Sequence, residues 1–240
     1  MRDKFIFTDV HGCGLELERL IEPFHNCDLY SLGDNFDRAF HGVKVFEILR
    51  KHNVTCLLGN HELKLLQYLN GEKRWAPKHY YLFLHDLVDK HGAGAVDELR
   101  DFISAMPTLV NTDGMILVHG GIDVTNPTSP SLQCNVYGNF DPETRVDRDQ
   151  DWWNAYNGDA LVLYGHITHD APLLKFNSSG KLNSIGLDTA ACHGNSLTGL
   201  HISGDPKDGF KLTFHGIRTK DYFADLKKMT VQPFLVPPRE

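Results

Sequence analysis

Five short segments of the chain end an apolar run with side chains that can bind a metal ion or move a proton. They read D-V-H-G (9–12), G-D-N-F-D-R (33–38), G-N-H-E (59–62), H-G-G (119–121) and G-H (165–166). Together they offer carboxylate, imidazole and amide donors but no thiolate, a mixture that suits Mn²⁺, Fe or Zn²⁺ better than a cysteine-rich structural zinc site. A carboxylate can bridge two cations, and an asparagine carbonyl can bind one cation without adding charge. The segments therefore predict a metal site.

The elements that must position these side chains alternate along the first 70 residues. Apolar runs predict strands over 4–8, 28–32 and 54–58, and helical spacing follows each run. A β-α-β-α-β-α order favours a parallel sheet with right-handed crossovers. Ligands of such sheets bind outside the carboxyl ends of the strands, which is where the polar segments lie.

The rest of the chain is richer in predicted strands. Residues 80–104 have a helical pattern, while hairpins are predicted around Asp113-Gly114 and around 177–180. Further strands are expected over 161–164, 197–202 and 210–214. Residues 123–159 show no clear period, and a loop of that length in a compact domain indicates a functional segment or a flexible one. No repeat interrupts the pattern, so one domain over 1–240 is expected.

Composition narrows the classes of partner. The 240 residues carry a net charge of −7, which argues against a basic face for extended nucleic acid or for an anionic membrane. The five cysteines include no C-x-x-C pair, and free thiols in a reducing compartment are the simplest interpretation. The N-terminus has no apolar signal-peptide core and no stretch reaches transmembrane length, so a cytoplasmic protein is expected. The sequence does not determine an oligomeric state.

Taken together, the five segments resemble those of the calcineurin-like metallophosphoesterases. The similarity is greatest to the branch with serine/threonine protein phosphatases, lambda phosphatase and bacterial diadenosine tetraphosphatases, and L-D-T-A-A (187–191) also resembles the bacterial members. This resemblance implies an α/β (α+β) fold, a β-sandwich of two mixed sheets flanked by helices. It also implies two divalent metal ions, with Mn²⁺ favoured and Fe or Zn²⁺ as alternatives.

The resemblance also assigns roles to individual residues. Asp9 and His11 would bind the first metal, and Asp34 would bridge both metals. The second metal would be completed by Asn60, His119 and His166.

The remaining roles concern the phosphoester. A hydroxide bridging the metals would attack phosphorus directly, and His61 would protonate the leaving group. Asp37 would fix the tautomer of His61, and Arg38 would bind the phosphoryl oxygens. Glu62 is expected to be a structural carboxylate in the first turn of a helix.

Several positions depart from the family pattern. Ala39 follows Arg38 where the family usually has glycine, so the local turn could differ. Ala155 stands where a second phosphate-binding arginine is expected, which leaves Arg145 and Arg148 as candidates beside the alternative that both are solvated loop residues. His169 falls one position late for a further metal ligand and is left out of the ligand set. The thiol of Cys13 is adjacent in sequence to the site, but no C-x₅-R arrangement follows it.

The leading hypothesis is a metal-dependent phosphoester hydrolase that resembles serine/threonine protein phosphatases, because G-N-H-E and the Asp37–His61 pair are intact. The alternative substrate is a dinucleoside polyphosphate such as diadenosine tetraphosphate. Three aromatic residues of the long loop could stack on its adenine or could anchor the loop to the core: Trp152, Trp153 and Tyr156. A third hypothesis is a non-catalytic metal-binding scaffold, although such a protein should have lost ligands. A nuclease is disfavoured by the acidic charge.

Overall fold

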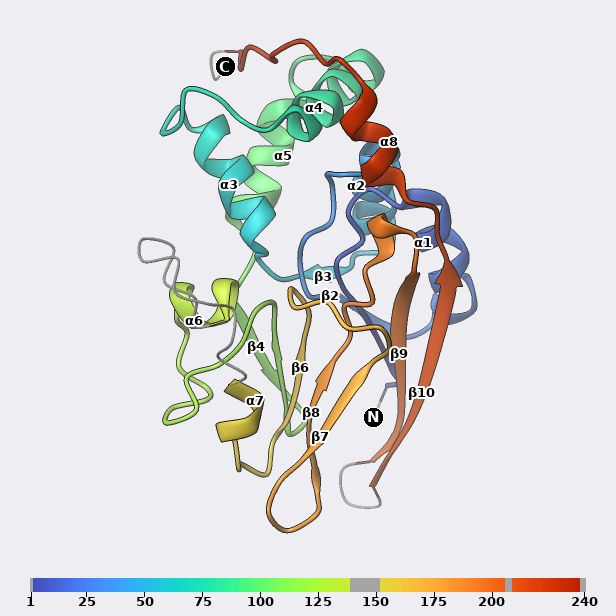
Figure 1. Cartoon of the computed structure of the whole chain (residues 1–240), viewed down its shortest axis with the longest axis vertical. Coiled ribbons are helices and arrows are strands. Elements are labelled where there is room, and N and C mark those ends of the chain that lie inside the picture. Colours follow the sequence, from blue (N-terminus) through green and yellow to red (C-terminus); the bar gives the residue numbers. More distant parts are fainter. Residues whose placement is uncertain (1, 139–151, 206–208, 238–240) are drawn as a thin grey trace.

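The computed structural model of the chain describes residues 2–138, 152–205 and 209–237, and its strands form two five-stranded sheets (Figure 1). The first sheet has the order β10-β9-β1-β2-β3. Its strands are β1 (Lys4–Phe7), β2 (Asp28–Ser31), β3 (Thr55–Cys56), β9 (Ser196–Asp205) and β10 (Gly209–Arg218). Strands β1, β2 and β3 are parallel, while β9 runs antiparallel to both β1 and β10.

The second sheet has the order β4-β5-β6-β8-β7 and is also mixed. Its strands are β4 (Leu109–Thr112), β5 (Met115–Val118), β6 (Leu161–Tyr164), β7 (Leu173–Phe176) and β8 (Leu182–Gly186). The inner three, β5, β6 and β8, are parallel, and the two edge strands pair antiparallel to them. Two mixed sheets confirm the predicted fold class.

Alternation along the strands explains how the sheets pack. Ile6 of β1 faces the core between the sheets, where it joins Leu117 of β5 and Leu163 of β6. Its neighbours Phe5 and Phe7 point to the opposite face and pack in the core beneath the helices. Since successive side chains of a strand alternate in direction, each sheet can contribute to two cores at once.

The helices cover the outside of the sandwich and one end of it. In Figure 1 helices α3, α4, α5 and α8 lie together beyond the ends of β2 and β3. The helices are α1 (Gly14–Ile21), α2 (Gly42–Lys51), α3 (Asn60–Leu69), α4 (Lys78–His91), α5 (Ala95–Ser104), α6 (Leu132–Tyr137), α7 (Trp152–Ala155) and α8 (Tyr222–Lys228). None of the described helices is long and apolar enough to cross a bilayer.

Most predicted elements are present, with corrections at their ends. The predicted strand over 54–58 contains only the short β3, because the residues that follow turn toward helix α3. The predicted helical region 80–104 belongs to two helices, which Gly92 interrupts with a φ of 82° that glycine adopts readily. The hairpin at Asp113-Gly114 is confirmed, and both turn residues have positive φ.

Candidate active site

The site forms where β1, β2, β3, β5 and β6 end, and strained backbone marks it. Asp9, His11, Asp34, Arg38 and His166 all have φ between 45° and 72°, a left-handed conformation that is uncommon for residues other than glycine. Such conformations persist only where the surroundings enforce them. Here hydrogen bonds between neighbouring strand ends do so, for example from the His11 amide to the Asp34 carbonyl at 2.9 Å.

The first group of donors lies after β1 and β2. Asp9, His11 and Asp34 are all buried. Each offers one ligand atom, and these three atoms lie within 4.8 Å of one another. His11 Nε2 is 3.7 Å from Asp9 Oδ1 and 3.7 Å from Asp34 Oδ2. These three residues form the cluster that was predicted for the first metal.

The second group includes Asp34 again, with donors that follow β5 and β6. Atoms of Asp34, His119 and His166 lie within 4.8 Å of one another. His119 Nδ1 donates to the carbonyl of Leu32 at 3.0 Å, which leaves its Nε2 facing Asp34 Oδ1 at 3.4 Å. Asp34 is therefore common to both groups, as a bridging carboxylate must be.

Asn60 begins α3 and completes the second group. Its Oδ1 lies 3.1 Å from His119 Nε2, 3.1 Å from His166 Nδ1 and close to Asp34 Oδ2. When several ligands bind one metal ion at about 2.1 Å, their donor atoms lie about 3 Å from one another. Thus the amide oxygen, two imidazole nitrogens and one carboxylate oxygen fit a single divalent cation.

The electrostatics of the donors also fit a cation. Burial opposes the charge of Asp34, yet His119 and His61 outweigh burial and hold the pKa of Asp34 well below its usual range. Burial likewise opposes the charge on His119, but Asp34 raises its pKa to about 9. Burial and the charge of His119 lower the pKa of His166 to about 3. Because a metal binds neutral imidazole, we expect metal uptake to release the proton of His119.

Asp37 connects the metal site to the expected general acid. Its Oδ2 lies 2.5 Å from His61 Nδ1, and its Oδ1 lies 2.9 Å from Nδ1 of the expected metal ligand His11. The carboxylate therefore orients both rings at once, as carboxylates behind metal-bound histidines commonly do. The contact with His11 was not predicted from the sequence. His79 Nε2 is 3.1 Å from the same Oδ2, but it is not aligned for a hydrogen bond.

The side chains of His61 and Arg38 point toward each other beside the first donor group. Nε2 of His61 lies 2.9 Å from one terminal nitrogen of Arg38, and the other terminal nitrogen is 3.2 Å from His11 Nε2. Burial opposes protonation of His61, but Asp37 and Asp34 outweigh it and raise the pKa of this histidine. Ala39 does not need the conformational freedom of glycine, because Arg38 and not Ala39 has the positive φ of this turn, at 72°. The Ala39 amide donates to the His11 carbonyl at 2.8 Å.

Glu62 has the structural position that was expected of it. It lies in the first turn of α3 and accepts hydrogen bonds from the backbone amides of Asp34 and Asn35, both at 2.7 Å. Burial and the nearby charge of Asp34 raise the pKa of Glu62 to about 7. Gly59 is required beside it, since a Cβ there would lie 2.2 Å from Asp34 Oδ1.

One acidic residue of the site was missed. Asp188 follows β8, is 4% exposed and accepts a hydrogen bond from the Ala190 amide at 2.9 Å. Burial and the negative charge of Asp9 raise the pKa of Asp188 well above its usual range. The signal was present in the sequence, because Asp188 directly follows an apolar strand just as Asp9 does. It was noted only as part of the family resemblance.

Other sequence candidates lie elsewhere. The aromatic residues of the long loop are buried against the outer face of the second sheet, so they anchor the loop to the core: Trp152, Trp153 and Tyr156. Ala155 brings no cation, while Arg145 and Arg148 lie outside the described residues. His169 Nε2 lies 3.4 Å from the hydroxyl of Tyr164.

Cysteine chemistry is not supported by the geometry. Cys13 is fully buried, and burial raises its pKa far above the ordinary range, so the thiol stays protonated. All five cysteines lie in the described part of the chain and are free. Free thiols agree with the sequence interpretation but do not identify a compartment.

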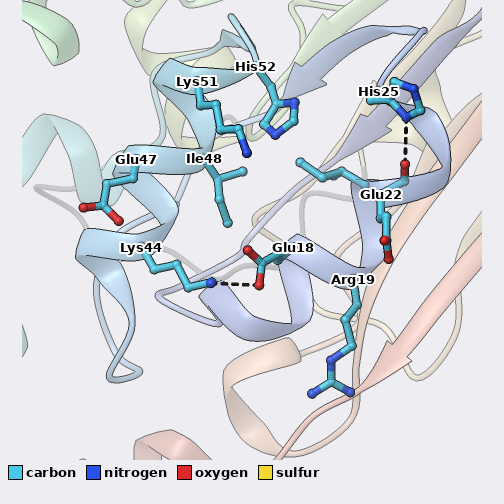
Figure 2. Close-up of a pocket in the computed structure, with 10 residues that line it drawn as sticks. Glu18, Arg19, Glu22, His25, Lys44, Glu47, Ile48, Lys51 and His52 are labelled. Carbon is cyan, nitrogen blue, oxygen red and sulfur yellow. Dashed lines mark hydrogen bonds and ion pairs between the residues drawn. The ribbon is translucent and has the colours of Figure 1, made fainter.

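A separate hollow of about 600 Å³ lies between α1 and α2 (Figure 2). Its wall is mainly charged, with an ion pair of 2.7 Å between Lys44 and Glu18 and with Lys51 and His52 on the α2 side. No predicted site residue lines it. The candidate active site is therefore the group of donors at the strand ends and not this hollow.

Comparison with known proteins agrees with this geometry. The model of the calcineurin-like phosphoesterase family matches residues 5–204. The chain belongs to this family. It is a metallophosphoesterase, and members of this family are hydrolases.

Two kinds of relative are informative. Asymmetrical bis(5′-nucleosyl)-tetraphosphatases PrpE of Bacillus velezensis and Bacillus subtilis are 27% and 28% identical to it, and each match covers 82% of this chain and 88% or 89% of the relative. The symmetrical bis(5′-nucleosyl)-tetraphosphatase of Haemophilus ducreyi is 30% identical over 54% of this chain and 49% of its own length.

Solved structures extend the likeness in fold. A metallophosphoesterase from Sphaerobacter thermophilus has a TM-score of 0.55 at 16% identity, covering 95% of this chain and 93% of its own. A serine/threonine phosphatase from Saccharomyces cerevisiae has a TM-score of 0.56 at 12% identity, covering 89% and 79%. At these sequence identities the structural similarity shows a shared fold and does not indicate the substrate.

Asn60→Ala is expected to lower metal content and activity together. The substitution removes the only neutral oxygen donor among the predicted ligands, and we expect metal affinity to fall by about tenfold or more. Metal per chain, measured after dialysis by mass spectrometry, and kcat/KM for a phosphoester test this. Asn70→Ala, on the exposed C-cap of the same helix, is the matched control. Full metal content and full activity in Asn60→Ala would remove Asn60 from the site.

Proposed function

We propose that this metallophosphoesterase hydrolyses dinucleoside polyphosphates such as diadenosine tetraphosphate with the help of two divalent metal ions. The observation that carries the chemistry is Asp34, whose carboxylate belongs to both donor groups. Asp9 and His11 would hold one ion, while Asn60, His119 and His166 would hold the other. Manganese is the ion we would load first, because the oxygen and nitrogen donors suit it.

The bound ions would supply Lewis acidity toward the phosphoryl group and a water of lowered pKa. The chain itself supplies the remaining functions. Arg38 directs two N–H groups into the site and would bind the phosphoryl oxygens. His61, held by Asp37 at 2.5 Å and with its pKa raised, would deliver a proton from Nε2 to the leaving oxygen.

The choice of substrate class rests on the relatives. The intact Asp37–His61 pair favours the protein phosphatase hypothesis, but a general acid can protonate either a serine oxygen or a phosphate oxygen, so the pair does not choose between the two substrates. The relatives that match most of the chain are bis(5′-nucleosyl)-tetraphosphatases. A nucleotide substrate is therefore favoured over a phosphoprotein. A non-catalytic scaffold is disfavoured because the chain retains every residue of the predicted ligand set together with His61.

A side-by-side assay of the Mn²⁺-loaded protein tests the proposal. One arm contains diadenosine tetraphosphate and the other a phosphothreonine peptide, with products separated by chromatography. We expect kcat/KM for the dinucleotide to be higher by about tenfold or more. Release of ATP and AMP would indicate asymmetrical cleavage, and release of ADP alone symmetrical cleavage. Faster hydrolysis of the peptide would overturn the substrate class, and metal binding without any turnover would favour the scaffold.

A further inference from the structure

Arg38 places a positive charge beside the first donor group but not beside the second. It contacts His11 of the first group and the general acid His61. Ala155 supplies no cation on the side of the second sheet. A polyphosphate chain carries a negative charge on each phosphate, so a site that binds it needs further donors beyond a single arginine.

Lys64 lies one turn after Asn60 on α3 and is half-buried. Its Nζ is 3.0 Å from the side-chain amide of Asn60, a predicted ligand of the second group. Within the described parts of the chain, no carboxylate lies within 4.0 Å of this ammonium group. Lys4 shows the usual arrangement by contrast, since its buried ammonium pairs with Asp113 at 2.6 Å.

The orientation of Asn60 decides what Lys64 can bind. When the amide oxygen faces Asp34, His119 and His166, as a metal ligand must, the amide nitrogen faces Lys64 Nζ at 3.0 Å. Both groups are then hydrogen-bond donors, and neither can accept from the other. When the amide is turned over, its oxygen accepts from Lys64 and its nitrogen faces Asp34 Oδ2 at 3.0 Å. Metal binding therefore removes the acceptor of Lys64.

We propose that Lys64 binds the phosphate chain of the substrate and helps to select polyphosphates over simple phosphate monoesters. A phosphate oxygen can accept from the Lys64 ammonium and the Asn60 amide nitrogen together, which satisfies both donors. The contact lies beside the second donor group, whereas Arg38 lies beside the first. Lys64 is thus placed to bind a phosphate other than the one that Arg38 holds. This inference rests on the proposed hydrolysis of dinucleoside polyphosphates.

The test compares Lys64→Met and Lys64→Arg with the wild type, all loaded with Mn²⁺. Lys51→Met, on α2 beside the hollow of Figure 2, is the matched control. Binding of a methylene analogue of ATP that is not hydrolysed is measured by calorimetry, and kcat and KM are measured for diadenosine tetraphosphate and p-nitrophenyl phosphate. Metal per chain is measured for each variant.

In Lys64→Met we expect the Kd of the analogue to rise by about tenfold, since a charged hydrogen bond is lost. The ratio of kcat/KM for the dinucleotide to that for the monoester should fall by a similar factor, through KM. Lys64→Arg should restore part of the analogue affinity and part of the kcat/KM ratio. The metal content of both variants should equal that of the wild type. Equal losses on both substrates with reduced metal would assign Lys64 to positioning Asn60 and would overturn the inference, as would unchanged analogue binding.

The two proposals can fail separately. If the wild type does not cleave diadenosine tetraphosphate, the proposed substrate is wrong, and analogue binding still reports on Lys64. If the wild type cleaves it and Lys64→Met binds the analogue like the wild type, only the role of Lys64 is wrong.

Discussion

Asp34→Asn is expected to abolish hydrolysis, with a loss of about 10³-fold or more in kcat/KM. Asp34 contributes to both donor groups, so the substitution weakens both metal positions at once. An asparagine has nearly the same shape but lacks the negative charge that two cations require. Metal per chain, measured by mass spectrometry, should fall from two to one or none, while circular dichroism should show a folded protein.

Asp225→Asn is the control, because Asp225 is exposed on α8, where it pairs with Lys228. Its metal content and activity should match the wild type. An Asp34→Asn protein that keeps two ions and hydrolyses substrate within about tenfold of the wild-type rate would show that Asp34 does not bridge.

The predicted ligands could be found from the sequence because their signal is local. A polar residue that directly follows an apolar strand must lie at the sheet edge, and in a parallel sheet these edges coincide. Asp9, Asp34 and Asn60 follow three different strands, and this rule predicts that they lie together at one edge of the sheet. Asp188 carries the same signal, but the sequence shows its strand only as one side of a hairpin, and the parallel pairing of this strand with β6 is visible only in the structure.

The contacts that the sequence could not supply depend on side-chain directions between elements. The bond between Asp37 and His11 joins residues 26 positions apart and requires the turn at Arg38 to fold back on the turn after β1. The proximity of Lys64 to the site depends on the rotation of α3 about its axis, which the pattern of apolar residues does not define closely. For the same reason the burial of Trp152 and Trp153 could not be decided without the second sheet in place.

Helix α8 and the full extent of strands β9 and β10 were the hardest features of the fold to predict. Helix α8 has seven residues, and it packs against the short turn Ala191–His193, which lies far away along the chain. Strands β9 and β10 each have ten residues and extend beyond the predicted runs, because pairing with each other supports polar residues that carry no strand signal alone.

His61→Ala is expected to lower kcat by about 10²- to 10⁴-fold for phenyl phosphate, a monoester with a poor leaving group, while both metals stay bound. His61 is not itself a predicted metal ligand, and its Nδ1 bonds to Asp37. The loss should be much smaller for p-nitrophenyl phosphate, whose leaving group needs little protonation. His79→Ala is the matched control, because His79 lies 3.1 Å from the same carboxylate without hydrogen-bond alignment. Equal losses on both substrates would argue against His61 as the acid.

The pH profile provides an independent readout of the same role. In the proposed mechanism the protonated form of His61 is the active acid, so activity should be present below its pKa and should fall as pH rises through it. Burial opposes the protonated form, but Asp37 and Asp34 outweigh burial and raise this pKa, which extends activity toward higher pH. Asp37→Asn removes the first of these charges, so the alkaline fall should move to lower pH. In His61→Ala that fall should disappear, and its persistence there would assign it to another group.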